Sequence, residues 1–262
     1  MEYKALFLDI DGTILMPDHS YSESTAEAIK QLKTQGIHVF IATGRPLHEI
    51  FGLAKELGID HFIGYNGASA VYQGKEIVNE PLEKKKVQQF LEITSEHQHE
   101  MVLYTNHSNH FTAIDDPVTK AFIETFQMKE NTNEFNASSD HILGATLMKL
   151  DQSDVRLYEF DENIHLSRVN VPGMRHAYDV IRSNVNKGEA IKKVLAHLNI
   201  EKNQAIAFGD GLNDKEMLST VGTGFAMGNA DPKLFQYASH RTTEVTEDGI
   251  FNGLKQIGLL KK

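Results

Sequence analysis

The chain has 262 residues, of which 40% are hydrophobic and 24% charged, a composition typical of folded globular proteins rather than of disordered chains. It contains no cysteine, which excludes a disulfide framework and a thiolate metal site. Its formal net charge of −10 argues against an extended nucleic-acid interface, because such an interface needs a cationic surface.

The N-terminal segment MEYKALFLDI lacks the basic and apolar regions of a signal peptide. No apolar run approaches the roughly 18 residues that a membrane span requires. We therefore expect a cytoplasmic protein that binds neither membranes nor nucleic acid. Nothing in the sequence implies an obligate protein partner.

Strand and helix patterns alternate at both ends of the chain. Apolar runs predict strands at 5–8, 37–42, 61–65, 205–208 and 223–227, and one-sided apolar patterns predict helices at 22–35, 46–57 and 187–198. Asp231-Pro232 is typical of the start of a further helix. This alternation predicts an α/β fold, with a Rossmann-like parallel sheet that has helices on both faces.

The middle of the chain has a different pattern, with a charged helical stretch at 83–97 and short strands at 101–105, 145–150 and 166–171. We predict an α/β domain over residues 82–183, inserted into a core formed by residues 1–81 and 184–262. An insert of roughly a hundred residues is an ordinary domain size. His97 and His99 are candidate metal ligands. Two side chains at this spacing near a helix end are expected to diverge, however, and this favours solvent-exposed histidines.

The most informative segment, Asp9-Ile10-Asp11-Gly12-Thr13, directly follows the first predicted strand. Ligands of open α/β sheets bind at the carboxyl ends of strands, so Asp9 lies where a nucleophile can act. Asp9 and Asp11 can face one ligand only if the backbone turns, as Gly12 permits. The two acids would repel each other without a cation, which points to a hard divalent ion. The alternative interpretation is an ordinary turn with solvated acids.

A second acidic segment, Gly209-Asp210-Gly211-Leu212-Asn213-Asp214, follows the predicted strand 205–208. Its alternative interpretation is a loop in which Asn213 or Asp214 caps the next helix. Two carboxylate clusters at strand ends together favour one shared metal site.

Two helix starts carry groups that can hold an anion. Thr43 offers a hydroxyl, and the amides of Gly44 and Arg45 face outward at the start of helix 46–57. Lys187 opens the helix 187–198 and can supply a positive charge. The alternative is that Thr43 and Lys187 are ordinary surface residues and that Arg45 pairs with a surface acid.

In chain order, these segments resemble the four motifs of the haloacid dehalogenase superfamily: Asp9-x-Asp11-Gly12-Thr13, Thr43-Gly44-Arg45-Pro46, Lys187-Gly188 and Gly209-Asp210-x-x-Asn213-Asp214. Asn66-Gly67-Ala68, the segment AMGNA at 226–230 and the large insert are similar to those of its Cof-type phosphatases, which carry a large α/β cap of the C2 type. The resemblance covers nearly the whole chain.

The resemblance implies a magnesium-dependent phosphatase of small metabolites. Asp9 would attack phosphorus and form an aspartyl-phosphate, while Asp11 would protonate the leaving oxygen and then activate water. Mg²⁺ would be held by Asp9, the backbone carbonyl of Asp11 and Asp210. The remaining implied groups are Thr43, Lys187, Asn213 and the amides of Ile10 and Gly44 on the phosphoryl group, Asp214 beside Lys187, and Arg45 facing the cap or the substrate.

The resemblance also narrows the reaction. Dehalogenases and P-type ATPases lack an acid at the position of Asp11, so dehalogenation is not expected. The inserted cap would close over the site and read the leaving group of a sugar phosphate, a nucleotide or a phosphorylated cofactor. The alternatives are a sugar phosphomutase with the same nucleophile and a catalytically silent metabolite-sensing protein.

Overall fold

The computed structural model describes residues 2–135, 141–169, 171 and 173–260. The chain forms two compact units. The first consists of Met1–Arg45, Ile50–Val78 and Asn186–Lys262, and the second of Pro46–Glu49 and Asn79–Val185. The second unit is therefore an insertion between two parts of the first, apart from four residues at the start of one helix.

The first unit contains an eight-stranded sheet in the order β14-β13-β12-β1-β2-β3-β4-β5. Its strands are β1 (Ala5–Leu8), β2 (His38–Ala42), β3 (Phe62–Gly64), β4 (Ser69–Tyr72), β5 (Lys75–Asn79), β12 (Ala205–Gly209), β13 (Thr223–Ala226) and β14 (His240–Arg241). The strands from β14 to β3 pair in parallel, and β4 runs antiparallel to β3. Fully buried apolar runs such as β1 suit the centre of a parallel sheet that is covered on both faces.

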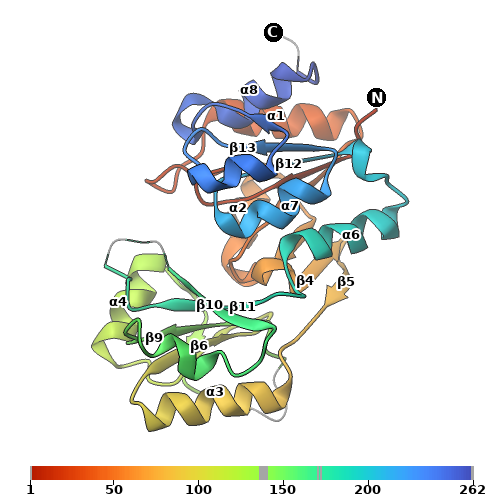
Figure 1. The fold of residues 1–262 in the computed structure, drawn as a ribbon. Helices are drawn as coiled ribbons and strands as arrows, with labels where there is room; N and C mark the ends of the chain where they lie inside the picture. Colours follow the sequence, from red (N-terminus) through yellow and green to blue (C-terminus); the bar gives the residue numbers. More distant parts are fainter. Residues whose placement is uncertain (1, 136–140, 170, 172, 261–262) are drawn as a thin grey trace. The chain divides into compact units, whose positions relative to one another are not determined.

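Helices cover both faces of this sheet, as predicted. The helices of this part of the chain are α1 (Glu23–Thr34), α2 (Leu47–Leu57), α6 (Lys187–Leu198), α7 (Lys215–Thr220) and α8 (Gly249–Gln256). Residues of α6 and α7 share one core with Phe7 and Phe40 of the strands. On the opposite face, Gly253 of α8 approaches the ring of Phe208, and Figure 1 shows α1 beside α8. The predicted α/β fold class is confirmed.

Local sequence explains where two of these helices begin. The hydroxyl of Ser22 accepts a hydrogen bond from the amide of Thr25 at the start of α1. The side chain of Asn186 accepts one from the amide of Glu189 at the start of α6. Each bond satisfies a backbone N–H that has no partner within its own helix. The cap of α6 thereby fixes the position of Lys187, its first residue.

The second unit is built on a six-stranded sheet in the order β10-β11-β9-β6-β7-β8. Its elements are α3 (Lys84–Glu96), β6 (Glu100–Tyr104), β7 (Asn109–Phe111), α4 (Pro117–Phe126), β8 (Asn131–Thr132), β9 (Gly144–Met148), α5 (Val155–Tyr158), β10 (Ile164–Arg168) and β11 (Tyr178–Arg182). The strand predicted at 166–171 begins earlier, at Ile164, and Asn170 lies outside the described residues.

The two faces of this sheet have different neighbours. On one face, Leu103 and Leu147 pack in a core with Phe90 of α3 and Tyr158 of α5. On the other, Val102 and Met148 pack in a second core with Phe122 of α4. Strand residues alternate between these two cores, as the pleat of a sheet requires.

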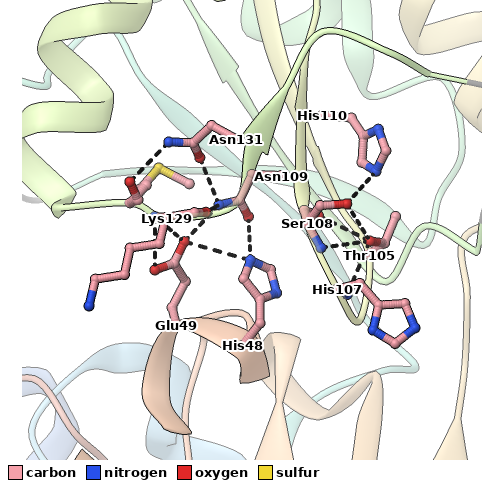
Figure 2. Close-up of polar contacts among 10 residues, drawn as sticks. His48, Glu49, Thr105, His107, Ser108, Asn109, His110, Lys129 and Asn131 are labelled. Atoms are coloured by element: carbon pink, nitrogen blue, oxygen red, sulfur yellow. Dashed lines mark hydrogen bonds and ion pairs between the residues drawn. The ribbon is translucent and has the colours of Figure 1, made fainter. Parts of the chain in front are cut away.

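The first turn of α2 groups with the second unit because its side chains bind β7. Asn109 is fully buried, and its amide nitrogen donates to Oε1 of Glu49 (2.7 Å). Nε2 of His48 lies 3.1 Å from the amide oxygen of Asn109. Figure 2 shows these side chains converging beside Lys129, whose backbone amide also donates to Glu49 (2.9 Å). Periodicity alone predicted that this turn belongs to the domain formed by residues 1–81 and 184–262.

The prediction for the paired histidines is correct for His97, which is exposed, and wrong for His99 and for the divergence of the two rings. The rings of His97 and His99 lie side by side, with centroids 5.7 Å apart, and His99 is buried. Nδ1 of His99 lies 2.8 Å from the hydroxyl of Tyr158, which supplies the polar partner that burial requires. The chain turns after α3, so the helical spacing assumed for this pair does not apply.

The helix predicted after Asp231 is a 3₁₀ helix, Pro232–Tyr237. The carboxylate of Asp231 accepts a hydrogen bond from the amide of Lys233 (2.8 Å) at its start. Within the described part of the chain, no helix is both long and apolar enough to cross a membrane.

Candidate active site

Three neighbouring strands bring the predicted site together. Asp9 follows β1, Thr43 follows β2 and Asp210 follows β12, and β1 lies between the other two strands in parallel register. The carboxyl ends of parallel strands meet at one edge of the sheet, so residues distant in sequence become neighbours. The amide of Asp9 donates to the carbonyl of Phe208 (3.1 Å) and extends the pairing to this edge.

Lys187 lies at the centre of the site. Its Nζ donates to Oδ1 of Asp9 (2.5 Å) and to Oδ1 of Asp214 (2.6 Å). Lys187 and Asp214 are fully buried, and Asp9 is 7% exposed. Burial alone would lower the pKa of Lys187, but Asp214 and Asp9 raise it above its usual value. Lys187 is therefore a permanent cation between two carboxylates, and not a surface residue.

Asp214 uses both of its oxygens within the protein. Oδ1 accepts from Lys187, and Oδ2 accepts from the amides of Asp210 (3.1 Å) and Gly211 (3.0 Å). These bonds shape the loop that carries Asp210, so Asp214 acts as a cap of this loop as well as a partner of Lys187. A β-carbon at Gly209 would lie 2.6 Å from the carboxyl group of Asp214, which explains the glycine there.

The turn after Asp9 is held against Asp210. Gly12 has φ +81°, and a β-carbon there would lie 2.4 Å from Oδ2 of Asp210. The hydroxyl of Thr13, which is 1% exposed, donates to Oδ1 of Asp210 (3.1 Å). The amide nitrogen of Asn229 donates to the carbonyl of Gly12 (2.9 Å). Both acidic segments are thus parts of one cluster.

Asp11 points to a different partner. Nε of Arg45 donates to Oδ2 of Asp11 (2.7 Å), and Nη2 of the same guanidinium binds Oδ1. The side chain of Asp11 is 52% exposed, in contrast to the buried Asp9. One of the roles expected for Arg45, pairing with an acid, is present in the structure, and that acid is Asp11.

The predicted phosphate-binding groups surround the same edge of the sheet. The hydroxyl of Thr43 accepts from the amide of Arg45 (3.1 Å). The side chain of Asn213 donates to Oδ1 of Asn66 (3.0 Å), and a β-carbon at Gly44 would lie 3.1 Å from the side chain of Asn66. Ile10 is completely buried, and its apolar side chain offers a ligand no polar group.

Thr13, Asn66 and Asn229 are structural members of the site to which the sequence assigned no role. The signal was present for each, since all three lie within the motifs that carry the family resemblance. Gly67, which follows Asn66, packs closely against the backbone of Asn186. It has φ +101°, and a β-carbon there would lie 2.3 Å from the carbonyl oxygen of Asn186.

The electrostatics of the cluster call for a cation. Burial, reinforced by the negative charge of Asp214, raises the pKa of Asp210 to about 7. Burial also raises the pKa of Asp9 well above its ordinary value, although Lys187 acts in the opposite direction. One oxygen from each of Asp9, Asp210 and Asp214 lies within 4.8 Å of the others. Against these three carboxylates stands one ammonium, so the ionised cluster has two excess negative charges.

These residues fit a divalent metal ion. Oxygen donors in an excess of negative charge are what Mg²⁺ prefers, and a bound cation would favour the ionised forms of Asp9 and Asp210, whose pKa values are raised by burial. Asp9 and Asp210 are better placed as ligands than Asp214, because both oxygens of Asp214 already have protein donors.

Comparison with known proteins identifies the family of this chain. The family model of the haloacid dehalogenase-like hydrolases matches residues 6–254. The Bacillus subtilis protein named "Putative phosphatase YkrA" is 36% identical over 262 residues, which are the whole of both chains. The chain therefore belongs to the haloacid dehalogenase-like hydrolases, and the resemblance predicted from its motifs is confirmed.

Other relatives show which kinds of phosphatase are similar to this chain. The 5-amino-6-(5-phospho-D-ribitylamino)uracil phosphatase YitU of Bacillus subtilis is 29% identical over 95% of each chain. A Geobacillus kaustophilus structure matches with TM-score 0.90 and 32% identity over 98% of this chain and all of the other. The sugar phosphatase BT4131, of subclass IIB, matches with TM-score 0.85 and 25% identity over the same shares. The fold is that of subclass IIB, with a second sheet in an inserted cap.

Proposed function

We propose that this protein is a magnesium-dependent phosphatase that hydrolyses phosphate monoesters of small metabolites through an aspartyl-phosphate on Asp9. The observation that carries the proposal is the buried group at the sheet edge, where Lys187 contacts both Asp9 and Asp214 and Asp210 lies alongside. Phosphoryl transfer needs positioning and charge neutralisation above all, and this group supplies both.

In the first step, an oxygen of Asp9 attacks phosphorus while the bond from phosphorus to the leaving oxygen breaks. Asp11 in its acid form gives its proton to that oxygen. In the second step, water attacks the phosphorus of the aspartyl-phosphate and passes a proton to Asp11. The bond from phosphorus to Asp9 breaks, which releases inorganic phosphate and restores the free carboxylate.

The surrounding residues support these steps. Lys187 neutralises charge on Asp9 and on the phosphoryl oxygens, and Asp214 holds its ammonium group in place. A magnesium ion held by Asp9, the carbonyl of Asp11 and Asp210 supplies Lewis-acid stabilisation of the phosphoryl charge when it is bound. Because both oxygens of Asp11 bind Arg45, proton transfer by Asp11 requires this pair to open.

The relatives support small phosphorylated metabolites as the substrate class. YitU is named for a phosphoribityl compound, and BT4131 is a sugar phosphatase. We therefore expect sugar phosphates or related phosphate monoesters as substrates of this chain.

The decisive experiment is phosphate release from a library of metabolite phosphates by wild-type protein and by Asp9→Asn. We expect Asp9→Asn to remain folded and to lose turnover, since an amide cannot form the acyl-phosphate. EDTA should stop the wild-type reaction and Mg²⁺ should restore it. Substantial turnover by pure Asp9→Asn, or turnover without metal, would contradict the mechanism. A requirement for a sugar bisphosphate activator would identify a mutase instead.

A further inference from the structure

A short turn between β3 and β4 has an unusual backbone conformation. Its residues Tyr65, Asn66 and Gly67 have φ values of 52°, 53° and 101°. Residues other than glycine seldom adopt positive φ values, and a buried aromatic residue such as Tyr65 is an outlier there. Such strain persists only where the surrounding structure imposes it, and it clusters at functional sites. We name residues 65–67 the left-handed turn, and its contacts show what imposes this conformation.

Two backbone hydrogen bonds fasten the left-handed turn to the predicted phosphate-binding segment after β2. The amide of Tyr65 donates to the carbonyl of Arg45 (3.2 Å), and the amide of Asn66 donates to the carbonyl of Thr43 (3.1 Å). Between these two bonds, a β-carbon at Gly44 would lie 3.1 Å from the side chain of Asn66. The turn therefore supports the backbone whose amides we expect to bind the phosphoryl group.

The left-handed turn also contacts the start of α6 and the loop after β12. Gly67 lies against the carbonyl group of Asn186, the residue that precedes Lys187. The amide nitrogen of Asn213 donates to Oδ1 of Asn66 (3.0 Å). The turn and these three segments all belong to the first unit. Segments that are far apart in the sequence, and that carry the family resemblance, therefore meet at one strained turn.

Asn66 fixes the direction of the Asn213 side chain. Asn213 is exposed, and Asn66 is the one hydrogen-bond partner of its side chain among the described residues. A primary amide has two N–H donors and one carbonyl acceptor, so the bond to Asn66 leaves one N–H and the oxygen of Asn213 for a ligand. Without this bond, an exposed asparagine would distribute these groups over several rotamers. The bond therefore lowers the entropic cost of binding a ligand through Asn213.

We propose that Asn66 is a positioning residue of the phosphoryl site and that it acts by holding the amide of Asn213 toward the phosphoryl group. This inference rests on the proposed function and on the predicted contact of Asn213 with that group, and it adds a residue that had no assigned role. The strain of the turn then has a physical reason, because the left-handed backbone places the side chain of Asn66 against both Gly44 and Asn213. A residue that acts through Asn213 should have little effect once Asn213 is removed.

The test is a double-mutant cycle on kcat/KM for nitrophenyl phosphate, with wild type, Asn66→Gly, Asn213→Ala and the double variant. Glycine adopts the left-handed conformation without strain, so Asn66→Gly keeps the turn and removes only the amide side chain. We expect each single variant to lower kcat/KM about tenfold, and the double variant to lose less than about threefold beyond Asn213→Ala. Losses that multiply in the double variant, or no loss in Asn66→Gly, would overturn the inference.

Asn199→Gly is the matched control in the same unit. Asn199 has φ 54° and ψ 43°, close to the φ of 53° and ψ of 33° at Asn66, but it follows the last residue of α6, at the opposite end from Lys187. The control therefore removes the same side chain from the same backbone conformation, away from the site. It should leave kcat/KM unchanged. A loss equal to that of Asn66→Gly would assign the effect to backbone freedom and would overturn the inference.

A binding measurement separates this inference from the proposed function. Inorganic phosphate is titrated calorimetrically, in the presence of Mg²⁺, into the four proteins of the cycle and into Asn199→Gly. We expect the Kd for phosphate to rise about tenfold in Asn66→Gly, little further in the double variant than in Asn213→Ala, and not at all in the control.

The two measurements together decide between the claims. Phosphate binding that depends on Asn66 through Asn213, without turnover of any ester, would overturn only the proposed reaction. Turnover and phosphate binding that do not depend on Asn66 would overturn only its positioning role. Wild-type protein that neither binds phosphate nor releases it from esters would overturn both.

Discussion

Each of the two units of this protein contains an aspartate whose pKa is raised by burial, but the two carboxylates have different partners. In the first unit, Asp9 contacts the ammonium group of Lys187, which a second carboxylate holds in place. In the second unit, the partly covered carboxylate of Asp179 accepts a hydrogen bond from the hydroxyl of Thr146. A carboxylate beside a buried lysine is neutralised within the protein. A carboxylate whose hydrogen-bond donor is neutral keeps its negative charge unless it binds a proton or a cation.

Removing the ammonium group of Lys187 should have the largest effect on the free energy of unfolding. Lys187→Met leaves Asp9 and Asp214 buried without a counter-charge, and we expect the free energy of unfolding to fall by about 3–5 kcal/mol. Lys86→Met is the matched control, since Lys86 also pairs with two acids but at a partly exposed site, and it should cost less than about 1 kcal/mol. Urea denaturation measures both changes. Similar losses in the two variants would show that burial does not distinguish these ion pairs.

The second unit also contains a buried neutral group whose loss should be costly. Asn109→Ala removes the donor to Glu49 and the partner of His48, and we expect a loss of about 2–3 kcal/mol. Amide hydrogen exchange should speed up at Lys129, whose N–H also binds Glu49. Asn106→Ala, at an exposed asparagine of the turn between β6 and β7, should change stability by less than about 0.5 kcal/mol. Equal exchange at Lys129 in both variants would contradict this role of Asn109.

The smallest effect has the opposite sign. Burial raises the folded-state pKa of Asp179 above the unfolded value of 3.8, so the folded protein holds this proton more tightly than the unfolded chain. The stabilising contribution is complete below pH 3.8 and is lost as the pH rises through the folded-state pKa. Asp179→Asn carries no charge and still accepts from Thr146. It should therefore stabilise the protein by about 1 kcal/mol at pH 7, and less as the pH falls toward 3.8.

Thermal or urea unfolding of wild type and Asp179→Asn across this pH range measures the gain. A gain at pH 7 that shrinks toward pH 3.8 would confirm that folding disfavours the ionised form of Asp179. Destabilisation at pH 7 would instead mean that the ionised Asp179 has a cationic partner in the folded protein.

The sequence by itself determined the strand and helix order of the core, because continuous apolar runs and one-sided apolar helices report burial directly. It also placed Asp9, Thr43 and Asp210 at strand ends, and parallel pairing then made them neighbours. The motif resemblance supplied the family, which the whole-chain comparisons confirm. Local spacing was sufficient there because these side chains follow directly from the backbone at the ends of strands.

Only the tertiary structure decided the partners of individual side chains. The pairing of Arg45 with Asp11, the burial of His99 and the grouping of residues 46–49 with the second unit all depend on contacts between segments that are distant in sequence. The hydrogen bonds of Thr146 with Asp179 and with Tyr104 depend on strand order and on antiparallel register, and a shift of one residue would send a side chain to the other face. Asp9 could therefore be identified from a sequence motif, whereas the partner of Asp179 could be identified only from the arrangement of the neighbouring strands.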